Sequence, residues 1–235
     1  MLENVIEWAN ANSGFVTILV FVATVVLGWL SGIFQALRNR PQFEIEKIEG
    51  PNFYSVHHTG RKHNGYSAHR TAIALYLSIT NVGSAPSAIK SVSVAFRCDL
   101  RPFSWQWFQH TLLWHWLEHP TVALEDFKVE IGEKAKVYPF LLQGTASTLT
   151  SSDTYLRVGK SVNGVVYFEH REAWGGFMPI EQNGKTKIKV RVEDAFGGSH
   201  SEVLEIPKVE LSEARKWSSD FGRTYETLDQ EDDAT

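Results

Sequence analysis

Residues 15–37 read FVTILVFVATVVLGWLSGIFQAL, a stretch of 23 residues without a charged side chain. At about 1.5 Å per residue, a helix of this length extends over roughly 35 Å, which exceeds the roughly 30 Å hydrocarbon core of a bilayer. A helix also pairs its backbone N–H and C=O groups within the segment, as lipid requires. The sequence therefore predicts a transmembrane helix over residues 15–37 that anchors the chain to a lipid bilayer.

The residues before this stretch argue against a cleaved signal peptide. Residues 1–14 contain Glu3 and Glu7 but no lysine or arginine, whereas a signal peptide begins with a positively charged region. The apolar run is also longer than that of a signal peptide. We therefore expect residues 1–14 to remain as a short N-terminal leader.

The distribution of positive charge predicts the orientation. Arg38 and Arg40 follow the apolar stretch at once, and the positive-inside rule places such residues in the cytoplasm. Cys98 is the only cysteine and forms no internal disulfide, as is usual in a reducing compartment. The sequence predicts a single-pass protein of the inner or plasma membrane with its C-terminal domain in the cytoplasm, joined by a short linker over residues 38–41.

Small residues recur at every fourth position of the predicted membrane helix: Thr24, Gly28, Gly32 and Ala36. Small side chains allow two helices to approach closely, so we expect this stripe to mediate self-association or contact with another membrane subunit. The alternative interpretation is that glycine is simply frequent in transmembrane helices.

Residues 42–210 read as short strands separated by turns. Apolar residues alternate with small or polar ones over residues 73–79, which predicts a half-buried strand, and alternate with lysine and arginine over residues 187–192. Turn residues follow the first of these strands at Asn81–Pro86. The pattern predicts a mainly β domain, an immunoglobulin-like antiparallel β-sandwich that lacks the Cys…Trp…Cys spacing of true immunoglobulin domains.

Residues 102–120 interrupt the strand pattern with an aromatic-rich segment, PFSWQWFQHTLLWHWLEHP. We expect a helical insertion that is apolar on most sides and must be covered. The cover could be the sandwich itself, the membrane interface or a partner subunit. The candidate interface residues are Trp105, Trp107, Trp114 and Trp116.

The C-terminal residues 211–235 are acidic and poor in apolar side chains. We expect a short helix near Leu211 and then a disordered tail.

Candidate chemistry is sparse. His57, His58, His63 and His69 are close in sequence, but no cysteine or carboxylate joins them, so we expect a solvated hairpin turn around Asn64-Gly65 and no metal site.

An acid–base set could be assembled from His170, Asp194 and His200, but their spacing in the sequence does not indicate one. No nucleophile or phosphate-binding motif occurs. The sequence therefore predicts no catalytic residues and no cofactor. The net charge of -4, without a basic stripe, argues against nucleic-acid binding.

These features favour a non-enzymatic membrane-anchored interaction or scaffold subunit of a membrane-associated assembly. One alternative is an oligomeric membrane effector whose sandwich senses a ligand or partner. Another is an outward-facing ligand-binding domain of the cell envelope.

Overall fold

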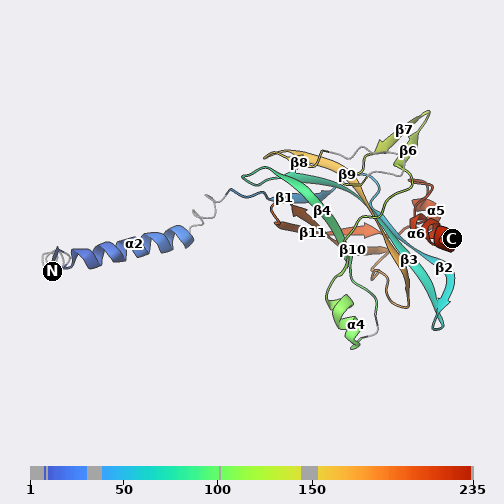
Figure 1. Cartoon of the computed structure of the whole chain (residues 1–235), viewed down its shortest axis with the longest axis horizontal. Helices are drawn as coiled ribbons and strands as arrows, with labels where there is room; N and C mark the ends of the chain where they lie inside the picture. Colours follow the sequence, from blue (N-terminus) through green and yellow to red (C-terminus); the bar gives the residue numbers. More distant parts are fainter. Residues whose placement is uncertain (1–7, 9, 31–38, 101, 144–152, 234–235) are drawn as a thin grey trace. The chain divides into compact units, whose positions relative to one another are not determined.

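The computed structural model describes residues 8, 10–30, 39–100, 102–143 and 153–233. The chain divides into two compact units, Met1–Arg40 and Pro41–Thr235. The first unit contains one long helix, and the second, called the domain below, is mainly β (Figure 1).

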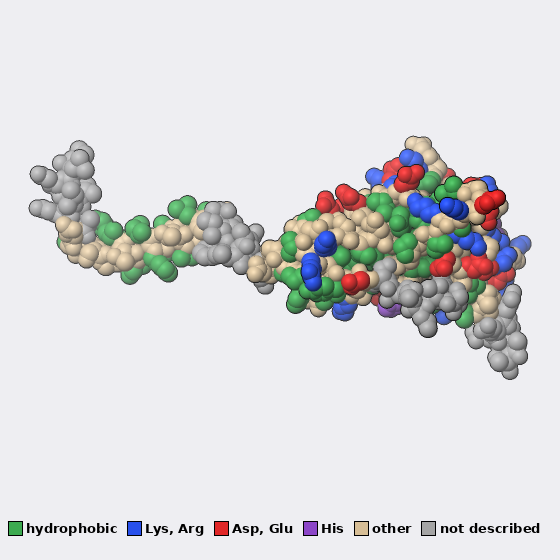
Figure 2. Space-filling view, turned by 90° about the horizontal axis from the view of Figure 1, so that it is seen from above, with side chains coloured by type: hydrophobic (Ala, Val, Ile, Leu, Met, Phe, Trp, Pro, Cys, Tyr) green, Lys and Arg blue, Asp and Glu red, His purple; other side chains and the backbone are tan. Residues whose placement is uncertain are grey.

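Helix α2 covers Ser13–Leu30, and none of its 18 residues is acidic, basic or buried. Figure 2 shows hydrophobic side chains and no charged ones along it. A helix that exposes apolar side chains on all sides requires apolar surroundings. Helix α2 is long and apolar enough to span a membrane. Residues 31–37, the rest of the predicted span, lie outside the described residues.

The strands of the domain form two antiparallel sheets and a separate hairpin. In the first sheet, the central strand β3 pairs with β1 and β2 along one edge and with β9 along the other. The second sheet has the order β11-β10-β4-β5, with β8 also beside β4. The bounds are β1 Phe43–Lys47, β2 Phe53–His63, β3 Tyr66–Asn81, β4 Ser87–Phe96, β5 His115–Leu117, β8 Tyr155–Leu156, β9 Ser161–Trp174, β10 Lys185–Asp194 and β11 Ser199–Pro207, and the hairpin consists of β6 Phe127–Ile131 and β7 Lys134–Tyr138.

The two sheets share one apolar core. Ile188, Val190 and Val192 of β10 are fully buried in it, together with apolar residues of β3, β4 and β9. The intervening residues of β10 are more exposed, so the predicted alternation is present. The prediction of a mainly β domain built from antiparallel sheets is confirmed.

Strand β3 is buried on both faces from Ala68 to Leu75, whereas buried and half-buried residues alternate along it from Tyr76 onward. Ile73 and Leu75 point into the core between the sheets, whereas Ala72 and Ala74 pack into a second core with Phe127, which lies on the β6–β7 hairpin. The predicted half-buried strand is therefore wrong at Ala74, whereas the predicted alternation is present over residues 76–79. The outer face is covered because elements distant in sequence, the hairpin and the C-terminal segment, fold onto it.

The predicted turn at Asn64-Gly65 is present. These two residues connect β2 and β3, and both have positive φ angles, 48° and 83°. A two-residue hairpin loop of this kind requires left-handed backbone at both positions, which asparagine and glycine tolerate.

The two ends of β4 define the two ends of the domain. Ser87, at its start, lies near Asn81, which pairs with Phe43 of the first strand; we call this the proximal end. Phe96 pairs with His115 at the distal end. The ten residues of β4 separate the two ends by roughly 30 Å.

The C-terminal segment is part of the domain. Helix α5 (Leu211–Ala214) is followed by helix α6 (Thr224–Asp233), and Phe221 between them is buried in the second core. The expectation of a disordered tail is therefore wrong through Asp233. Low apolar content suggested disorder, but Phe221 packs into the core and Asp229 is paired with the buried Arg70, and these contacts hold the helix.

Candidate functional site

Three short elements replace the single helix expected over residues 102–120. They are α4 (Trp105–Trp107), the π-helix η1 (Phe108–Leu112) and strand β5. The chain leaves the helical conformation at Leu113, whose backbone is extended. Strand β5 then bonds to the edge of β4, because an open sheet edge offers unpaired backbone groups. The prediction of one continuous helix is wrong for this reason.

This break separates the four predicted interface tryptophans into two pairs. Trp114 and Trp116 are half-buried beneath arginines: the Cζ of Arg97 lies 4.9 Å from the Trp114 ring centroid, and that of Arg191 lies 4.0 Å from the Trp116 ring centroid. Guanidinium groups stack favourably on indole rings. Trp114 and Trp116 are thus largely engaged within the domain.

The other pair belongs to an exposed apolar surface at the distal end. Trp105 is 79% exposed, and the half-buried Trp107 lies against the ring of Phe103, which is itself 94% exposed. We call the exposed members of this surface the aromatic tip: Phe103, Trp105, Phe108, Leu112 and Leu113. Large apolar side chains exposed together on one short segment are typical of interaction sites.

The backbone of the aromatic tip is strained at Phe103. Its φ angle is 62°, in the left-handed region that bulky residues avoid. Such a conformation costs about 1–3 kcal/mol and persists mainly at functional sites. The fold therefore maintains the exposed ring of Phe103 at an energetic cost.

His110, in the same segment as the aromatic tip, belongs to a row of three histidines. The Nδ1 of His115 is 3.4 Å from the Nδ1 of His110, and its Nε2 is 3.1 Å from the Nε2 of His170. The rings of Phe96 and Phe177 pack around the row. Because these histidines come from η1, β5 and β9, the row connects the aromatic insertion to both sheets.

Hydrogen bonds between imidazoles require at least one neutral ring in each pair. The pKa of His170 is lowered to about 4, mainly by burial and to a smaller extent by the neighbouring His115 and His69. The pKa of His115 is also lowered, mainly by burial and to a smaller extent by His110. His115 and His170 are therefore uncharged at neutral pH.

The histidines that the sequence singled out lie on the β2–β3 hairpin, where only His58 and His69, among the described residues, pack ring to ring, with centroids 6.5 Å apart. His63 stacks on Trp174, with ring centroids 4.1 Å apart, and His69 bonds through Nε2 to the carbonyl oxygen of Phe177. Among the residues that the structure describes, no group of three or more His, Cys, Asp or Glu side chains is arranged to hold a metal ion.

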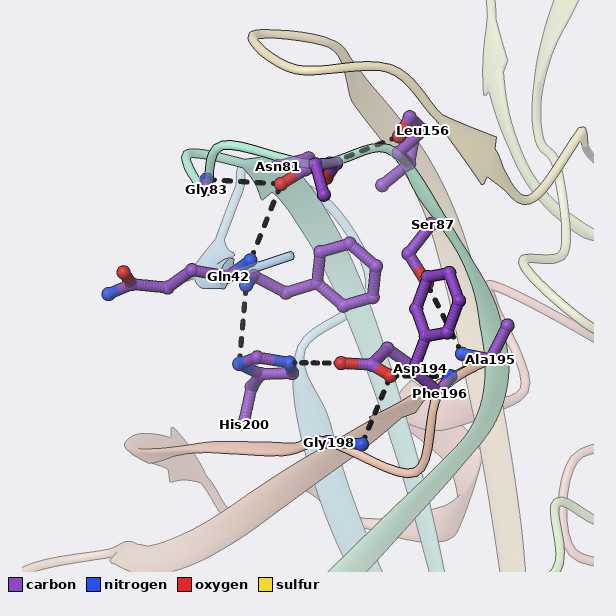
Figure 3. Close-up of polar contacts among 12 residues, drawn as sticks. Gln42, Asn81, Gly83, Ser87, Leu156, Asp194, Ala195, Phe196, Gly198 and His200 are labelled. Carbon is purple, nitrogen blue, oxygen red and sulfur yellow. Dashed lines mark hydrogen bonds and ion pairs between the residues drawn. The ribbon is translucent and has the colours of Figure 1, made fainter. Parts of the chain in front are cut away.

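A polar network lies at the proximal end (Figure 3). The Nε2 of His200 lies 3.0 Å from Oδ2 of Asp194, and its Nδ1 accepts the backbone N–H of Phe43 at 3.3 Å. Asp194 Oδ1 accepts the backbone N–H groups of Phe196 and Gly198 at 2.7 Å and 3.0 Å. The network thus fastens the first strand of the domain to the β10–β11 turn.

Burial of its carboxyl would by itself raise the pKa of Asp194. Hydrogen bonds from His200 and from the backbone amides of Gly198 and Phe196 outweigh burial and lower that pKa below its usual value. Two members of the acid–base set considered from sequence thus meet, whereas His170 bonds to His115 instead. The hydrogen bonds of the Asp194–His200 pair to Phe43, Phe196 and Gly198 join the turn to the first strand.

Asn81 extends this network to Gln42, at the start of the domain. Its Oδ1 accepts the backbone N–H groups of Gln42 at 3.4 Å and Gly83 at 3.0 Å, and its Nδ2 donates to the carbonyl oxygens of Ala85 and Leu156. A fully buried asparagine with four partners fixes the position of the residues that follow Pro41.

The predicted helix-association stripe is described only in part. Thr24 donates its hydroxyl to the carbonyl oxygen of Val20 within α2, and Gly28 lies one turn further on. Gly32 and Ala36, with the topology residue Arg38, lie outside the described residues, and Arg40 is exposed directly before the domain.

Sequence reasoning missed the histidine row. His110 and His115 are five residues apart, but His170 follows His115 by 55 residues, and only the packing of the two sheets brings it to His115. The chain matches no protein family and no curated protein when compared with both.

Proposed function

We propose that this protein is a non-enzymatic, membrane-anchored interaction subunit whose aromatic tip binds a partner protein of a membrane-associated assembly. The observation that carries the proposal is the exposure of five large apolar side chains on one short segment with a strained backbone at Phe103. Large aromatic side chains dominate the energetics of protein interfaces.

The location of the tip within the domain supports this proposal. It projects from the distal end, whereas the chain joins the domain at Phe43 on the proximal end. A partner bound at the tip would leave the connection to the anchor free.

The proposal includes three finer points: α2 crosses the membrane, the domain faces the cytoplasm, and its fold is an immunoglobulin-like sandwich. The strand order supports the last point. The pairings β1-β3-β9 and β11-β10-β4-β5 correspond to the A-B-E and G-F-C-C′ pairings of immunoglobulin domains.

Replacing the tip's aromatic side chains should abolish partner binding without unfolding the domain. We expect a Trp105→Ser/Phe108→Ser double variant to bind its partner at least roughly 30-fold more weakly, the effect of losing an interface hot spot. The measurement is quantitative mass spectrometry of proteins that copurify with the full chain from native membranes in mild detergent.

The matched control is Phe196→Ser, because Phe196 is equally exposed, at 75%, but lies on the proximal turn. Equal loss of partner from the control and the double variant would contradict a specific role for the tip. Flotation of residues 41–235 with liposomes would instead assign the tip to lipid.

Self-association of the anchor is a separate prediction. A Gly28→Ile or Gly32→Ile substitution should weaken it, because a branched side chain keeps the two helices apart. A membrane two-hybrid reporter measures this association, with Leu27→Ile as a control outside the stripe. An unchanged signal in both glycine variants would show that the stripe has no such role.

Imaging of single particles extracted in detergent distinguishes this proposal from an oligomeric membrane effector. An assembly with a second subunit supports the interaction module, whereas a closed ring of identical copies supports the effector.

A further inference from the structure

Arg70 is a buried arginine with unused hydrogen-bonding capacity. It lies in the central strand β3, is 6% exposed, and its Nη2 is 2.6 Å from Oδ2 of Asp229 in α6. Its Nε is buried and has no hydrogen-bond partner among the described residues. A guanidinium group carries five N–H donors, so one carboxylate oxygen does not satisfy it.

A pocket of about 210 Å³ lies at this guanidinium. Strand β2 contributes His57, His58 and Arg61 to its lining, β3 contributes Arg70, and α6 supplies the carboxylates. The Nδ1 of His57 is also buried without a partner within the described part of the chain. Because a water molecule takes about 30 Å³ of liquid volume, the pocket has room for a small polyatomic ion.

The two carboxylates that line this pocket both belong to α6. Glu226 and Asp229 both lie on that helix, and Asp229 is 4.0 Å from Arg61 as well as paired with Arg70. Two carboxylates remain nearby on β9: Glu172, 3.7 Å from Arg61, and Glu169, which interacts electrostatically with Arg70. Without α6, therefore, two arginines would face the pocket, with no carboxylate in its lining.

Helix α6 has little intrinsic stability. Its ten residues, TYETLDQEDD, have no basic residue in the last turn, and acidic residues crowd the C-terminal half. Negative charge at a helix C-terminus opposes the helix dipole, and isolated helices of this length are marginal in water. The helix thus depends on docking, through Arg70–Asp229, through the stacking of Arg171 on Tyr225, and through the hydrogen bond from Thr224 to the carbonyl oxygen of Val122.

We propose that Arg70, Arg61 and His57 form a binding site for a phosphate group and that the Asp229 carboxylate occupies this site when α6 is docked. A phosphate matches the planar guanidinium with two parallel hydrogen bonds and carries more charge than a carboxylate. Phosphate binding and docking of α6 compete for the same guanidinium, so the ligand releases the helix. This site is separate from the aromatic tip and does not depend on the function proposed for it.

The test titrates inorganic phosphate into the full chain in detergent and follows two readouts, calorimetric binding and amide hydrogen exchange of residues 224–229. Asp229→Asn keeps the side-chain shape but removes the competing charge. We expect it to bind phosphate about tenfold more tightly than the natural chain, the factor of one charge-assisted hydrogen bond. In the natural chain, phosphate should accelerate exchange in α6.

Two further variants complete the test. Arg61→Gln, at an arginine that is 59% exposed, should retain the fold and lose most of the phosphate affinity. Asp220→Asn, the same replacement in a surface ion pair with Arg223, should change nothing. Equal phosphate affinity in the natural chain and Asp229→Asn, or undiminished affinity in Arg61→Gln, would overturn the proposal.

The phosphate could be soluble or belong to a lipid headgroup. Full chain in nanodiscs containing phosphatidate, compared with nanodiscs of phosphatidylcholine alone, separates the two. Faster exchange of α6 with phosphatidate assigns a headgroup, faster exchange only with added inorganic phosphate assigns a soluble ligand, and no change in either overturns the site.

Discussion

Lowering the pH from 6.5 to 4 should reduce the free energy of unfolding of the domain by about 3 kcal/mol through His170. Above pH 6.5 the histidine is neutral in both the folded and unfolded chain, so it contributes no pH dependence. Between 6.5 and its folded pKa of about 4, only the unfolded chain binds the proton, so stability falls as the pH falls. Each unit of pKa difference corresponds to about 1.4 kcal/mol.

Other groups titrate in the same range. The lowered pKa of His115 adds to the loss. Burial raises the pKa of Glu169, so that this carboxyl stabilises the fold as the pH falls and partly offsets the loss. Comparing the pH dependence of stability between a His170 variant and the natural chain therefore separates the contribution of His170 from that of the other groups.

His170→Gln removes the titrating ring and retains an amide that can bond to His115. We expect chemical denaturation of this variant between pH 7 and 4 to show a shallower loss of stability than the natural chain. The matched control is His119→Gln at an exposed position, which should leave the pH profile unchanged. If the profiles of His170→Gln and the natural chain coincide, the histidine row does not govern acid stability.

Replacing Asp194 should destabilise the domain by about 3–5 kcal/mol, the usual effect of removing one partner of a buried pair. Its side chain is 2% exposed and accepts hydrogen bonds from His200, Phe196 and Gly198. In Asp194→Ala these three donors lose their acceptor. Urea denaturation measured at pH 7 gives the change in free energy of unfolding.

The neighbouring carboxylate provides the control. Glu193 pairs with Lys90 at 2.8 Å on the surface, where an ion pair contributes about 0–1 kcal/mol. Glu193→Ala should therefore cost far less than Asp194→Ala. Similar losses in the two variants would mean that the buried network at the proximal end does not stabilise the fold.

Sequence patterns predicted the candidate site only in part. Trp105 is exposed, but Trp114 and Trp116 lie beneath Arg97 and Arg191. A helical wheel considers only neighbours within one helix. It does not include the open edge of β4, with which residues 115–117 pair as a strand.

Local patterns in the sequence suffice for several features of this protein: the charge-free apolar helix, the alternating strand β10 and the hairpin turn at Asn64-Gly65. Each of these depends on residues within a few positions of one another, through helix length, side-chain period and backbone φ preference. Only the tertiary structure decided that β3 is buried on both faces over residues 68–75, that His110, His115 and His170 form a row, and that α6 docks on Arg70. These features depend on contacts between residues that are distant in the chain, because a buried charge or apolar face is covered by whichever element the fold brings to it.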